Sequence, residues 1–76
     1  MTESRKSRIR KTIEDIEFAI SEVKDLMQEE QDAFDNQPLG REMSDSDYQM
    51  LEAIENLDGA IEEMRDAKGY LEEAIA

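Results

Sequence analysis

A seven-residue repeat in the second half of the chain constrains the fold more than any other feature of the sequence. Between residues 50 and 75, large apolar residues alternate at steps of four and three, with Lys68 as the exception. This spacing assigns them to heptad positions a and d, which lie on one face of an α-helix. Alanine fills position g in four consecutive heptads, as Ala53, Ala60, Ala67 and Ala74. Apolar residues at three of the seven heptad positions, a, d and g, make a face as wide as that of a helix in a bundle. The pattern predicts a helix over about residues 45–75.

The first half of the chain carries the same spacing from Ile9 to Phe34, which predicts a helix over about residues 5–34. Two polar residues interrupt the a and d columns, Lys68 at a and Glu30 at d. Each is interpreted either as a long side chain that reaches solvent or as a residue that specifies register or oligomeric state. The residues predicted to form the core and the dimer interface are Ile13, Ile16, Ile20, Val23, Met27, Ile54, Leu57, Ile61, Met64 and Leu71.

One break separates the two predicted helices and makes residues 35–44 a loop. It contains the only proline of the chain, Pro38, together with Gly40, and both residue types favour turns. Ser44 then suits the N-cap of the second helix, and Asp47 three residues later completes a variant of the capping box. Two helices of similar length joined by a short loop predict an all-α fold, an antiparallel and coiled-coil-like two-helix hairpin. This hairpin would occupy residues 1–76 as a single domain.

The width of the apolar face predicts a partner for the hairpin. A single hairpin leaves half of that face in water, and a chain of 76 residues has little core of its own. A second copy would cover the face, so we predict a homodimer in which two hairpins form a four-helix bundle. A swapped dimer of long helices with the loop opened would use the same heptads and is the alternative.

The chain contains neither histidine nor cysteine. This excludes a histidine general acid or base, thiol nucleophiles and thiolate metal sites, and we expect no enzymatic activity, cofactor or metal. The pairs Glu14/Glu17 and Glu63/Asp66 have the spacing by which all-α nucleotide pyrophosphohydrolases hold Mg²⁺. Such spacings arise by chance in a chain with 21 acids, so a Mg²⁺-dependent hydrolase is a distant alternative.

The formal net charge of -12 argues against nucleic acid as the main partner. Residues 1–11 nevertheless contain five bases and one acid. An antiparallel hairpin would place them beside Glu72 and Glu73, which we expect to compensate their charge. No apolar run is long enough to span a membrane, and none follows the basic start as in a secretory signal. We therefore expect a cytoplasmic protein without membrane contact.

Carboxylates dominate heptad positions b, c, e and f, on the polar surface of both predicted helices. They are interpreted either as a solvated surface or as an acidic rod that occupies a basic groove in the manner of a nucleic-acid backbone. Phe18, Tyr48 and Tyr70 lie outside the apolar columns and are candidate partner contacts. The candidate partner-binding acidic residues are Asp15, Glu22, Asp25, Glu29, Asp32, Glu55, Glu62 and Asp66.

Residues 29–38 read Glu-Glu-Gln-Asp-Ala-Phe-Asp-Asn-Gln-Pro and precede acidic Ala-Ile-x-x-Leu heptads. This stretch resembles a class of small acidic helical proteins of bacteria and phages that carry a similar loop motif before similar repeats. The resemblance implies a phage or mobile-element origin and transfers no functional residues. We expect a non-catalytic accessory or inhibitor protein whose acidic face binds a basic host protein. The alternative is a structural or assembly module that binds through its apolar face.

Overall fold

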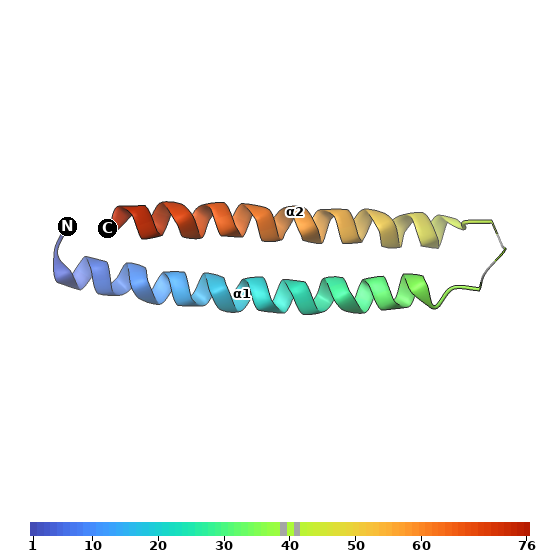
Figure 1. Ribbon diagram of the computed structural model, residues 1–76, viewed down its shortest axis with the longest axis horizontal. Helices are drawn as coiled ribbons and strands as arrows, with labels where there is room; N and C mark the ends of the chain where they lie inside the picture. The colour runs from blue at the N-terminus through green and yellow to red at the C-terminus, as the bar shows by residue number, and fades with distance from the viewer. Residues whose placement is uncertain (39, 41) are drawn as a thin grey trace.

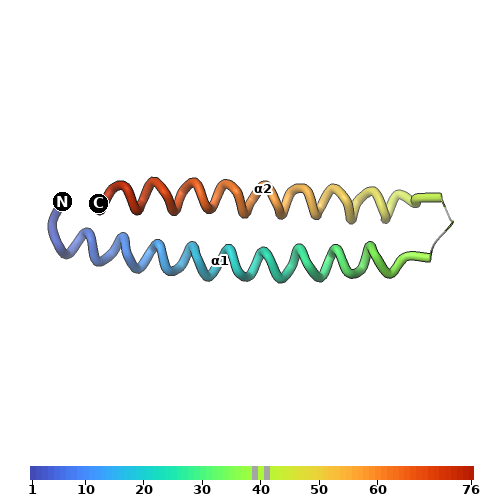
Figure 2. The backbone as a smooth tube through the Cα atoms, in the orientation of Figure 1, coloured from blue at the N-terminus to red at the C-terminus, as the bar shows by residue number. Residues whose placement is uncertain are grey.

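Two antiparallel helices form a rod in the computed structural model, which describes residues 1–38, 40 and 42–76 (Figure 1). Helix α1 spans Glu3–Asp35 and helix α2 spans Asp45–Ala74. The rod measures 60 × 14 × 14 Å, with both termini at one end and the connecting loop at the other (Figure 2). The predicted all-α antiparallel hairpin is confirmed.

The described part of the connecting loop lies where proline and glycine predicted it. Helix α1 ends with the Asn36 amide donating to the Asp32 carbonyl and the Gln37 amide donating to the Phe34 carbonyl, each at 3.1 Å. Gly40 has φ +81°, a left-handed conformation that residues other than glycine rarely adopt. Positions 39 and 41 of the predicted loop lie outside the described residues.

The core of the hairpin is thin and centres on the a columns. Ile61 is 2% exposed, and Ile13 and Ile20 are each 8% exposed. The other seven residues of the predicted core and dimer interface are half-buried, because each helix has only one neighbour to pack against. These seven are Ile16, Val23, Met27, Ile54, Leu57, Met64 and Leu71.

Helix α1 begins at Glu3, two residues earlier than predicted. The Thr2 hydroxyl accepts the Arg5 amide at 3.3 Å as an N-cap, and Glu3 places an acid in the first turn, where it favours the helix dipole. The signal was present in the sequence, because threonine before an acidic residue is a common helix start. The bases that follow Thr2 and Glu3 favoured a later predicted start, since positive charge opposes the dipole at a helix N-terminus.

Two of the five bases at the start of α1 form ion pairs within α1. Arg10 lies 4.0 Å from Glu3, and Lys11 pairs with Asp15 one turn later. The hydrogen bond to Asp15, followed by its charge, raises the pKa of Lys11 above the ordinary value. None of the ion pairs between described residues joins this segment to Glu72 or Glu73. The expected pairing with the end of α2 is therefore absent from the described residues, and the two ion pairs that form lie along α1, where they need no register between helices.

Helix α2 begins with the predicted capping box. The Asp47 amide donates to the Ser44 hydroxyl at 3.3 Å, and the Ser44 amide donates to the Asp47 carboxylate at 2.8 Å. Asp47 is only 3% exposed, although it is charged. Its burial follows from its position a, which turns it toward α1 while its carboxylate satisfies the helix end.

Replacing Ser44 with alanine is expected to lower the free energy of unfolding by about 1 kcal/mol, because one amide of the first turn loses its acceptor. Thermal unfolding followed by circular dichroism measures this change. The control is Ser46→Ala, an exposed serine in the first turn of α2 for which a small change is expected. Equal losses in both variants would contradict a capping role for Ser44.

Candidate protein-binding surfaces

The burial pattern shows how each helix is turned relative to its neighbour. The most buried apolar residues, Ile13, Ile20 and Ile61, all occupy position a, so the a columns face across the seam between the helices. In an antiparallel pair, the d and g columns of both helices then lie on one side of the seam and the e columns on the other. Positions b, c and f point outward. The rod therefore has two long faces and two outer edges, each with its own composition.

The outer edge of α1 carries a row of carboxylates, here called the acidic stripe. It occupies positions c and f between residues 15 and 32, which point directly away from α2, and no base lies in these columns over that range. Lys11, which precedes Asp15 by one turn, pairs with the first carboxylate of the row. All carboxylates of the stripe are exposed. The Gln28 amide nitrogen donates to the Asp32 carboxylate at 2.9 Å along this edge. The acidic stripe consists of Asp15, Glu22, Asp25, Glu29 and Asp32.

The three remaining candidate acids lie on the other helix. Glu55, Glu62 and Asp66 occupy positions b and f of α2, and all three are exposed. Because the outer sides of two paired helices face opposite directions, the structure does not bring these acids together with the acidic stripe. The eight candidates thus form two separate acidic edges.

Lys68 interrupts the a column of α2 and bridges the two helices. Its ammonium lies 3.3 Å from the Glu17 carboxylate of α1 and 3.9 Å from the Glu72 carboxylate of α2. The side chain is 32% exposed, so its stem covers part of the seam while its charge reaches the surface. Sequence reasoning did not identify Glu17 as the partner. A lysine at position a indicates that a carboxylate is near, but only the register of the two helices decides which one.

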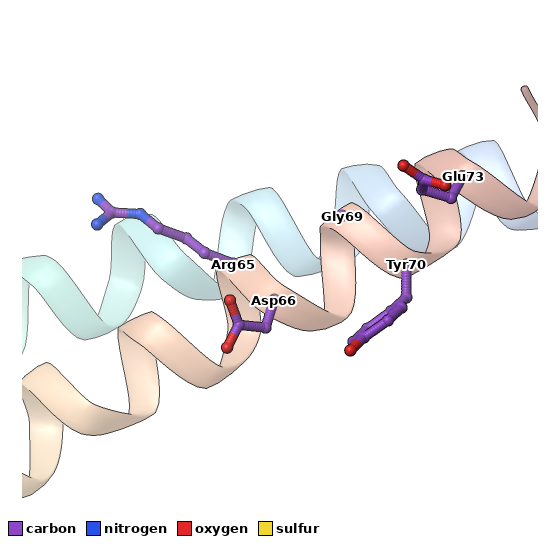
Figure 3. Close-up of a pocket in the computed structure, with 5 residues that line it drawn as sticks. All are labelled: Arg65, Asp66, Gly69, Tyr70 and Glu73. Carbon is purple, nitrogen blue, oxygen red and sulfur yellow. The ribbon is translucent and has the colours of Figure 1, made fainter.

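The exposed aromatic residues are spread along the rod. Phe18 is 70% exposed within the acidic stripe, Tyr48 is 59% exposed at the start of α2, and Tyr70 is 78% exposed near its end. Figure 3 shows Tyr70 beside a shallow hollow on α2 where Gly69 has no side chain. Asp66 and Tyr70 extend to the same side of the helix, and the hollow is lined by α2 alone.

The described residues contain no group of three or more acids that could hold a metal ion. Glu14 and Glu17 on α1 and Glu63 and Asp66 on α2 are exposed side chains of the polar surface. The Glu17 carboxylate forms an ion pair with the Lys68 ammonium.

Within the described residues, neither α1 nor α2 has the length of apolar sequence needed to cross a membrane. No protein-family model, curated protein or solved structure matches this chain.

Proposed function

We propose that the protein is a non-catalytic binding module whose acidic stripe docks onto a basic protein. The observation that carries the proposal is the row of five exposed carboxylates on one edge of α1, of which only Asp15 is paired with a base, Lys11. A surface of one sign attracts and orients a partner of the opposite sign. Phe18, exposed within the same row, adds apolar contact area of the kind that is enriched at interfaces.

The spacing of the stripe supports mimicry of a nucleic-acid backbone. From Asp15 to Asp32 the helix advances about 25 Å at 1.5 Å per residue. Five carboxylates over that length give about one charge per 5 Å, compared with one phosphate per 3.4 Å of axis on one strand of duplex DNA. The stripe is thus a single row of charge somewhat sparser than one strand. A groove that holds one phosphate backbone is the partner surface that fits it.

The setting we propose is the cytoplasm of a bacterial host. The resemblance of residues 29–38 to small acidic proteins of bacteria and phages supports a role as an accessory or inhibitor protein of a phage or mobile element. The composition supports a role without catalysis, because histidine and cysteine are both absent from the sequence.

A tagged pull-down from nuclease-treated bacterial lysate, eluted by a salt step, tests the acidic stripe. A basic nucleic-acid-handling protein is expected to bind and to elute as salt rises, because salt screens contacts between exposed charges. The stripe variant carries Glu22→Gln, Asp25→Asn and Glu29→Gln. At about 0.5–1 kcal/mol per exposed ion pair, these three changes are expected to weaken binding of the recovered protein about tenfold to a hundredfold.

The matched control carries Glu52→Gln, Glu55→Gln and Glu62→Gln on the outer side of α2. It changes the net charge by the same three units, and all three positions are exposed. This control is expected to bind the recovered protein nearly as well as the wild type does. Equal weakening by both variants would show that net charge rather than the stripe governs binding, and salt-resistant binding would contradict the proposal.

The second candidate function is a structural or assembly module that binds through apolar contacts. The observation in its favour is the exposure of apolar residues beside the seam, with Leu26 52% exposed. Such a module would bind in a manner insensitive to salt. It would also bind equally well with either set of neutralised acids.

A further inference from the structure

One long face of the hairpin is almost free of charge, and we refer to it as the uncharged face. It consists of the d and g columns from residue 9 to 33 in α1 and from residue 50 to 74 in α2. Glu30 is the only charged residue among these sixteen positions. On the opposite side of the seam, six of the eight e positions in the same heptads are charged. The two faces therefore differ in charge, and only the uncharged face is suited to burial in an interface.

The hairpin exposes more surface than a chain of its mass does when folded into a globule. Its accessible area is 5843 Å². A globular monomer of 8.8 kDa exposes about 4,800 Å² by the usual scaling with mass, so the rod carries an excess of about 1,000 Å². A stable interface covers about 800 Å² on each partner, and one side of a rod of 60 × 14 Å has about that area.

We infer that the uncharged face is covered by a second copy of this chain, which gives a four-helix dimer. The inference does not depend on the acidic stripe, which lies on an outer edge and stays exposed in such a dimer. The face suits self-association because it combines rows of alanine with larger side chains. Alanine at Ala60 and Ala67 allows the partner backbone to come close, while Leu26 and Leu57 supply the apolar area.

Charge complementarity selects the orientation of the two copies. The loop end of the rod is strongly acidic, since residues 29–47 contain seven acids and one base. The terminal end of the rod is not acidic. Residues 1–11 contain five bases and one acid, and residues 66–76 contain one base and three acids. Packing the loop end of one copy against the terminal end of the other brings opposite charges together, whereas packing like ends together opposes two acidic ends. The copies therefore lie antiparallel.

Sedimentation equilibrium at micromolar concentration tests the pairing. The wild type is expected at twice 8.8 kDa, and a mass of one chain across the concentration range would overturn the inference. Ala67→Glu places a charge on the uncharged face at a position that is exposed in the single hairpin. This variant is expected to weaken dimerisation at least tenfold. The matched control, Asn56→Glu, adds the same charge at an exposed outward position of α2 and is expected to remain dimeric.

A spin label at Asn36→Cys tests the orientation, because the chain has no native cysteine and Asn36 is exposed at the loop end. In the antiparallel dimer the two labels lie at opposite ends, so a distance approaching the 60 Å rod length is expected. Parallel packing would place both labels at one end, within about 20 Å for helices 8–10 Å apart. A swapped dimer of long helices would bring both loops to its centre and also give a short distance. Either short distance would overturn the proposed arrangement.

Discussion

Replacing Ile61 with alanine is expected to lower the free energy of unfolding by about 3 kcal/mol, the usual cost of removing three buried carbon atoms and leaving a cavity. Among the described residues, Ile61 is the most buried apolar side chain, at 2% exposure. A single core in a chain of this size supplies only about 3–5 kcal/mol. The variant is therefore expected to lose most of its helical structure near physiological temperature.

Urea and thermal unfolding followed by circular dichroism at a fixed protein concentration measure the effect of Ile61→Ala. The concentration is fixed because association would otherwise contribute to the apparent stability. The matched control is Phe18→Ala, which removes a larger side chain at 70% exposure. Its expected change is within about 0.5 kcal/mol. A loss at position 18 as large as that at position 61 would contradict a core centred on the a columns.

Replacing both Gly59 and Gly69 with alanine is expected to stabilise the protein by about 2 kcal/mol. Both glycines lie inside α2, where glycine costs about 1 kcal/mol relative to alanine because of its greater backbone freedom when unfolded. A methyl group added at either position meets no atom within 4 Å, so nothing in the hairpin opposes it. The expected rise in melting temperature is about 8–15 °C for a domain of this size.

Gly40→Ala serves as the control for the helical glycines and is expected to have the opposite sign. A methyl group added at Gly40 would also meet open space, but the φ of +81° at this residue is unfavourable for alanine. The expected result is a destabilisation of about 1 kcal/mol. If all three substitutions changed the melting temperature in the same direction, backbone conformation would not be the cause.

The heptads and the turn residues predicted the local structure closely. Helix α2 begins at Asp45 as predicted and ends at Ala74, one residue short of the expected boundary. Ser44 and Asp47 form the capping box that their spacing indicated. These features depend on residues within one or two turns of one another, so they are encoded locally. The early start of α1 was missed because its cap and its basic residues gave opposing local signals.

The pairing of charges depended on positions far apart in the sequence and was predicted less well. Lys68 reaches Glu17 on the other helix, 51 positions away along the chain. Arg10 and Lys11 of the basic start instead pair with acids one or two turns away in their own helix. The eight acidic candidates are exposed, and their division between two outer edges follows from the way the helices face each other.

The sequence by itself determined that two helices form, where they begin and end to within two residues, and how wide an apolar face each presents. The tertiary structure decided which part of that face meets the neighbouring helix. The a columns with Ile13, Ile20 and Ile61 close the seam, while the d columns stay half-buried and the g columns are half-buried or exposed. A helical period identifies which residues share a face, but it does not say which part of a wide face turns toward one neighbour. That choice depends on packing between segments distant in the sequence, and in the single hairpin it leaves the uncharged face exposed to solvent.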